Sequence, residues 1–207
     1  AFANKFWNAA RFALGRCSEP APVDTVADLD LVDRWMLSRV ARARRLIDEA
    51  IGGYQFNACA EILYDLIWRD FCDWYLEAVK PTIAADRRQQ QVLRSTLDAV
   101  ARLLHPVCPF VTEALWPHLV VPETTGIPGL VLPPSDLAAT AAWPVTDGLE
   151  DAAAEATFDR IKELVNAIRR ARAEHDVPPR TPLTLSAGEA VRSLLAPAEA
   201  AVRSLCQ

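Results

Sequence analysis

The sequence lacks the features that carry chemistry in most small enzymes. Its 207 residues include only seven glycines, and none of them forms a phosphate-binding loop or another nucleotide motif. The three histidines share no ligand spacing with the cysteines, and no Ser–His–Asp or Cys–His triad context is present. These absences predict a chain with no catalytic residues, no cofactor and no metal ion of its own.

Long apolar runs are also absent. No stretch approaches the ~20 residues of a membrane span, and the N-terminus has no signal-peptide layout. The five cysteines are odd in number and widely spaced, which indicates buried free thiols in a reducing, cytoplasmic setting rather than disulfides. An initiating methionine is missing and the first residues continue an amphipathic helix, so we expect an excised piece of a longer protein.

Charges are segregated along the chain although the net charge is only −5. Residues 19–33 and 123–155 contain five and six acids with no lysine or arginine, whereas residues 34–45 contain five arginines and no acid. Residues 1–16 and 160–180 are also basic. Because a phosphate backbone responds to local basic surface, this pattern leaves nucleic-acid binding open. A set of merely solvated faces is the alternative.

Apolar residues recur at helical spacing through the first 120 residues. They predict an antiparallel bundle of about five helices, at about 1–17, 30–52, 55–79, 87–104 and 110–119, with breaks at Gly52–Gly53, Pro81, Pro106 and Pro109. The helix at 55–79 is apolar around most of its circumference and belongs at the centre, with Ile67, Trp68 and Phe71 buried.

The rest of the chain predicts two further regions and leaves the fold mainly α. Residues 121–152 are rich in Pro, Gly and acids and predict a connector. Residues 153–207 predict a basic helix to Glu174, a strand at 182–186 and a helix over 189–205, which together make a small incomplete α/β subdomain.

Four stretches carry a resemblance to a known family. They are NKFWNAARF at 4–12, DRWM at 33–36, FCDWYLEAVKP at 71–81 and HPVCPFVTEALW at 105–116. The third is specific, and the similarity extends over nearly the whole chain. The sequence resembles the C-terminal anticodon-binding region of the valyl-tRNA synthetases, which are class I aminoacyl-tRNA synthetases.

This resemblance implies a helical anticodon-binding bundle whose partner is valine tRNA. The family's ATP- and Mg-dependent ligase chemistry requires a catalytic domain with HIGH and KMSKS signatures, which the sequence lacks along with the inserted editing domain. Those domains would act in cis in the parent enzyme, and we expect a monomer. Residues 153–207 would lead toward a C-terminal coiled coil.

The first helix offers the parts of a base-reading surface at i, i+3 and i+4 spacing. Valine anticodons carry A in the middle and C third, and such bases are read when unstacked on an aromatic platform with polar groups at their edges. Asparagine can pair with adenine, phenylalanine can stack on a base, and basic residues can hold phosphate. The resemblance maps family contacts onto Lys5, Asn8, Phe12 and Leu76.

Spacing alone adds further candidates, and each candidate has a structural alternative. Arg11, Asp73 and Lys80 extend the proposed surface, and Arg42 and Arg45 are possible phosphate contacts. Phe12 could instead belong to the core, and the arginines could be solvated. At the level of the whole chain, the alternatives are the isoleucyl enzyme's anticodon domain and a helical scaffold that binds a protein partner.

Overall fold

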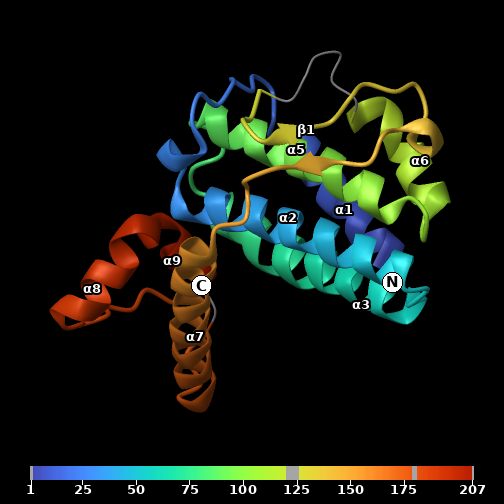
Figure 1. Ribbon diagram of the computed structural model, residues 1–207. Coiled ribbons are helices and arrows are strands. Elements are labelled where there is room, and N and C mark those ends of the chain that lie inside the picture. Colours follow the sequence, from blue (N-terminus) through green and yellow to red (C-terminus); the bar gives the residue numbers. More distant parts are fainter. Residues whose placement is uncertain (1, 120–125, 179–180, 207) are drawn as a thin grey trace.

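Helices dominate the residues that the computed structural model describes, 2–119, 126–178 and 181–206, in agreement with the mainly α prediction (Figure 1). Proline and glycine mark the expected breaks, because proline removes a backbone donor and glycine tolerates the turn after a helix. The bundle comprises α1 (Phe2–Leu14), α2 (Leu31–Gly52), α3 (Phe56–Tyr64), the π-helical segment η2 (Asp65–Tyr75), α4 (Leu76–Val79), α5 (Arg87–Leu104) and α6 (Pro109–Leu119). Single 3₁₀ turns are η1 (Val26–Asp28), η3 (Ala138–Thr140) and η4 (Ala196–Ala198).

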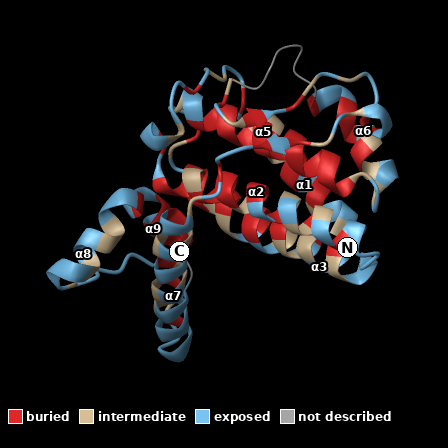
Figure 2. Cartoon of the chain, in the orientation of Figure 1, coloured by how far each residue is buried: buried red, intermediate tan, exposed pale blue. Residues whose placement is uncertain are grey.

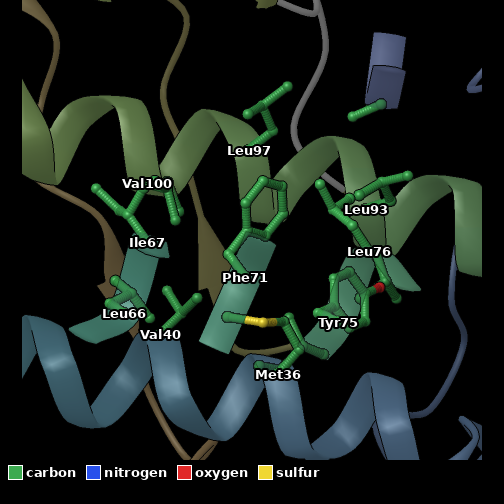
Figure 3. Close-up of a cluster of buried hydrophobic side chains, with 14 of the residues drawn as sticks. Met36, Val40, Leu66, Ile67, Phe71, Tyr75, Leu76, Leu93, Leu97 and Val100 are labelled. Carbon is green, nitrogen blue, oxygen red and sulfur yellow. The ribbon is translucent and has the colours of Figure 1, made fainter. Parts of the chain in front are cut away.

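The core lies between α2, η2 and α5 (Figures 2 and 3). Met36 of α2 and Leu97 of α5 approach Phe71, which is fully buried, from opposite sides. Ile67 is buried as predicted, but the prediction for Trp68 was wrong. Trp68 is only half-buried because it faces α1 rather than α5.

The long helix that carries Trp68 changes from α to π geometry along its length. The segments α3, η2 and α4 form one continuous helix over residues 56–79, as expected, but an α-helical period was assumed throughout. A π-helix closes i→i+5 hydrogen bonds and has more residues per turn, so residues five apart lie nearer to one side than in an α-helix. Trp68 and Asp73 therefore both face α1, where a strict i+4 stripe would separate them.

A buried polar network connects α2, η2 and α5. The Tyr75 hydroxyl donates to Asp33 at 2.7 Å, and Gln89 Nε2 donates to the other carboxylate oxygen at 3.2 Å. Thr82 in turn donates to Gln89 Oε1 at 2.6 Å. Burial raises the pKa of Asp33 to about 7, although the bonds from Tyr75 and Gln89 act in the opposite direction.

Residues 126–151, most of the predicted connector, pack closely on the bundle; residues 121–125 lie outside the described ranges. The segment includes the antiparallel pair β1 (Leu130–Val131) and β2 (Val145–Thr146). Arg102, buried in α5, pairs with Asp98 at 2.7 Å and donates to the carbonyls of Pro133 and Ala142, both at 2.9 Å. One buried guanidinium thus holds two points of the segment.

The last region begins with α7 (Ala152–Glu174), which extends away from the bundle (Figure 1). The predicted strand at 182–186 was wrong, because the structure shows no strand over the described residues 181–188. Arg172 instead donates to the carbonyls of Pro178 and Thr181, which ties this stretch to α7 without a sheet partner. The predicted final helix is divided into α8 (Glu189–Leu195) and α9 (Glu199–Leu205).

Through its last turns the chain returns to the bundle. Arg169 donates to the carbonyl of Leu205 at 2.8 Å, and Ser204 donates to that of Glu77 at 2.9 Å, so α9 lies between α7 and α4. Among the residues described, no helix combines the length and apolarity that crossing a membrane requires.

Candidate nucleic-acid interface

The predicted site is centred on α1, which runs alongside the long helix of residues 56–79 in the same direction. Phe2 contacts the rings of Tyr64 and Trp68, whereas Phe12, ten residues later, lies beside Lys80. The apolar side of α1, including Phe6 and three alanines, is buried against the bundle. The other side of α1 is exposed and lies beside the exposed residues of η2 and α4. Together these residues form the candidate surface.

Lys5 lies at the centre of this surface. Its Nζ atom forms an ion pair with Asp73 at 2.5 Å and lies 3.7 Å from the centroid of the Trp68 ring. The structure thus brings together two of the predicted residues, Lys5 and Asp73. In this pair the charge of Lys5 is already balanced, so a phosphate or a base edge would have to share or replace the carboxylate.

Asn8, Arg11 and Phe12 follow on the outer side of the same helix. Asn8 and Arg11 are exposed, and Phe12 is half-buried against the core. The Phe12 ring lies 5.3 Å from the Arg16 guanidinium and 5.7 Å from Lys80 Nζ. Phe12 therefore combines both alternatives raised by the sequence: one part of the ring packs on the bundle, and two cations frame the rest.

Leu76 does not belong to this surface in the structure. Only 5% of it is exposed, and its side chain points into the core beside Tyr75 and Leu93 (Figure 3). A base cannot contact a leucine buried to this extent unless α4 moves. Lys80, one turn later, is exposed and pairs with Glu77 at 2.5 Å.

Arg42 and Arg45 lie away from α1, and carboxylates hold both of them. Arg42 pairs with Glu155 of α7 at 2.9 Å, and Arg45 pairs with Glu150 at 2.9 Å and Glu49 at 3.1 Å. The basic stretch at 34–45 is thus matched partly by neighbouring acids such as Glu49 and partly by acids more than 100 residues away. The pairs with Glu155 and Glu150 join α2 to the start of α7 and its preceding residues, and both arginine side chains stay about half exposed, so their phosphate contacts remain a prediction.

Glu155 makes most of the polar contacts between α2 and α7. It accepts from Ser38 at 2.6 Å and from Arg39 at 3.2 Å, in addition to Arg42. Burial alone would raise the pKa of Glu155, but the Ser38 hydrogen bond and the arginine charges lower it below its ordinary value. Glu155 therefore remains ionised where α2 and α7 meet.

Sequence reasoning missed three aromatic residues that extend the site at its other end. The rings of Phe2, Tyr64 and Trp68 lie 5.6–6.3 Å apart, with interplanar angles between 9° and 27°. We call these three residues the aromatic patch. The i, i+4 spacing of Tyr64 and Trp68 was visible in the sequence, but it was interpreted as a widening of the core.

The described side chains of this surface are aromatic, amide and charged groups that suit binding. Within the described ranges, no group of three or more His, Cys, Asp or Glu residues is placed to hold a metal ion. Burial raises the pKa of Cys17 to about 11 and that of Cys72 to about 12, which leaves both thiols protonated and unreactive at neutral pH. Aromatic faces, an amide and several cations suit an unpaired nucleotide strand.

Comparisons with known proteins agree with this description. The family model that matches residues 33–187 is the anticodon-binding domain of tRNA ligase. A valine–tRNA ligase of Rhodopirellula baltica is 36% identical over 99% of this chain and 20% of its own length. Those of Thermotoga maritima and Mycobacterium tuberculosis are 39% and 38% identical over 86% of the chain and 19% of their own lengths. The chain spans about a fifth of these curated relatives.

Proposed function

Because the chain belongs to the family of anticodon-binding domains of tRNA ligases, we propose that it binds the anticodon loop of valine tRNA through α1. The valine–tRNA ligases among its relatives support the choice of tRNA. The observation that carries the proposal is that one side of α1 is buried and the other presents an amide, two cations and an aromatic ring together. These groups belong to Lys5, Asn8, Arg11 and Phe12.

Each group has a separate task in this proposal. Phe12 stacks on one unstacked base, and Asn8, one turn earlier, hydrogen-bonds the edge of the middle adenine. Arg11, Arg16 and Lys80 hold the phosphates on either side. Lys5 and Asp73 exchange part of their ion pair for contacts to a base edge.

The chain would contribute recognition and no bond-making chemistry. We propose that ATP, Mg²⁺ and the aminoacylation and editing steps belong to other parts of a valine–tRNA ligase, with which this chain acts in cis. In such an enzyme the anticodon contact orients the tRNA so that its acceptor end reaches the catalytic centre. Valine-dependent ATP–pyrophosphate exchange by this pure chain would contradict that division of labour.

Changing both the middle base of the anticodon and residue 8 tests whether Asn8 contacts the adenine. Affinity is measured by fluorescence anisotropy for valine anticodon stem-loops with A or G in the middle position, using the parent chain and Asn8→Ala. We expect the parent to prefer A by about 1–3 kcal/mol, as a good bidentate contact allows, and Asn8→Ala to lose that preference. Asn166→Ala, an exposed asparagine on α7, is the matched control and should retain it. Equal preference in parent and Asn8→Ala would assign the adenine contact elsewhere.

A further inference from the structure

The aromatic patch has no role in the recognition scheme above, although it lies on the same surface. The Tyr64 and Trp68 rings are nearly parallel, at 9° and 5.6 Å between centroids, and Phe2 lies 5.9 Å from Tyr64. Tyr64 is 41% exposed, and the other two are half-buried. Phe6 and the alanines bury the inner side of α1, and the three rings continue from that contact to the surface.

A lysine, Lys5, lies against the aromatic patch. Lys5 Nζ lies 3.7 Å from the Trp68 centroid, and its partner Asp73 projects from the same π-helical segment. The π geometry makes this combination possible, since it aligns positions 68 and 73 toward α1. Lys5 lies over one face of the Trp68 ring, so a base that stacks there would displace the ammonium toward the adjacent phosphate, a combination of ring and cation that suits unpaired nucleotides.

We propose that the aromatic patch stacks a second nucleobase of the anticodon loop, distinct from the base on Phe12. This inference rests on the proposed function and names a further subsite of the same surface. Phe2 and Phe12 are ten residues apart on α1, so about 15 Å of helix separates the two platforms. Stacked bases of one strand lie only ~3.4 Å apart. The two platforms are therefore about four base steps apart, too far for two adjacent stacked bases to fill both, and Lys5 lies nearer the aromatic patch.

A stem-loop carrying 2-aminopurine at one loop position at a time tests the proposal, because this fluorescent base is quenched when it stacks. The parent chain is compared with Trp68→Leu and Tyr64→Leu, which keep apolar volume and remove the ring. Phe56→Leu, an exposed aromatic at the start of the same long helix, is the matched control. We expect one loop position to be quenched through the aromatic patch and another through Phe12. Trp68→Leu should abolish the first, leave the second, and weaken binding by about tenfold to a hundredfold.

The outcomes separate this subsite from the function on which it rests. If the parent binds the stem-loop and both patch variants bind and quench like the parent, the subsite is overturned while the anticodon function stands. If the parent itself fails to bind, both proposals fail. Thermal melting reports whether each variant folds, and if Trp68→Leu does not, the more exposed Tyr64→Leu decides the result. Weaker binding by Phe56→Leu to the same degree would also contradict a site confined to the patch.

Discussion

At the scale of single residues, Phe12 shows how one side chain can serve both the fold and the site. Its half-buried ring contacts the core and leaves a face between Arg16 and Lys80. A fully buried phenylalanine costs ~3–5 kcal/mol when it is truncated, whereas a stacking ring contributes about 1–3 kcal/mol per base. Loss of packing lowers the stability of the chain and loss of stacking lowers its affinity for RNA, so two measurements separate the roles.

We therefore expect Phe12→Ala to weaken stem-loop binding by about 1–3 kcal/mol and to destabilise the chain by less than a core truncation does. Anisotropy titration and thermal melting measure the two quantities. Phe110→Ala removes a ring that is 91% exposed and should change neither. A large stability loss with unchanged affinity would place Phe12 in the core alone.

We expect Asp33 to make the stability of the chain depend on pH, because burial raises its pKa. Its pKa is about 7 in the folded chain and close to 3.8 when unfolded, so the folded state binds the extra proton between these values. The stability associated with the neutral carboxyl is complete below about pH 4 and is lost as the pH rises through about 7. Each pH unit in that window changes the free energy of unfolding by at most about 1.4 kcal/mol.

Asp33→Asn should remove this dependence, because an amide retains the hydrogen-bonding shape and carries no charge. We expect its free energy of unfolding to exceed that of the parent at pH 8 and the difference to shrink toward pH 4. Urea unfolding at several pH values gives the comparison, and Asp136→Asn, an exposed acid in the connector, is the control. A difference that grows as the pH falls would show that Asp33 is ionised in the folded chain.

At the scale of elements, α7 is attached to α2 by the buried rings of Trp35 and Phe158, 4.3 Å apart, and by charged hydrogen bonds around Glu155. Hydrogen bonds to charged groups each contribute roughly 1.5–3 kcal/mol. We expect Glu155→Gln to destabilise the chain by at least this amount, because Ser38, Arg39 and Arg42 share a single carboxylate. Glu163→Gln, on an exposed position of the same helix, should cost little. Equal melting temperatures for the two variants would contradict the role of Glu155.

The positions of the helices could be predicted from the sequence, whereas their contacts with one another could not. Apolar spacing and proline positions located every helix of the bundle, because those signals are local. The π geometry of η2, the partners of Arg42 and Arg45, and the burial of Leu76 depend on contacts with distant segments. The strand expected at 182–186 alternates in sequence, yet a strand needs a partner, and Arg172 occupies the neighbouring carbonyls instead.

At the scale of the whole molecule, Arg102 joins the connector to the bundle. Arg102→Leu would leave Asp98 buried and unpaired and two carbonyls without their donor. Breaking a buried pair from one side costs about 3–5 kcal/mol. We expect a loss of that size in urea unfolding, with partial recovery when Asp98→Leu is added. If the free energy of unfolding of Arg102→Leu equals that of the parent, the contacts of Arg102 do not hold the connector on the bundle.

We have proposed that α1 and the helix beside it bind the anticodon loop of valine tRNA. Chemical footprinting of valine tRNA with this chain tests it most directly, at low salt and again at high salt, where phosphate contacts weaken. If α1 binds the loop as proposed, protection will be confined to the anticodon loop and its flanking stem, lost at high salt and absent with a tRNA of another anticodon. Protection elsewhere on the tRNA, equal protection of both tRNAs, or no protection at low salt would contradict it.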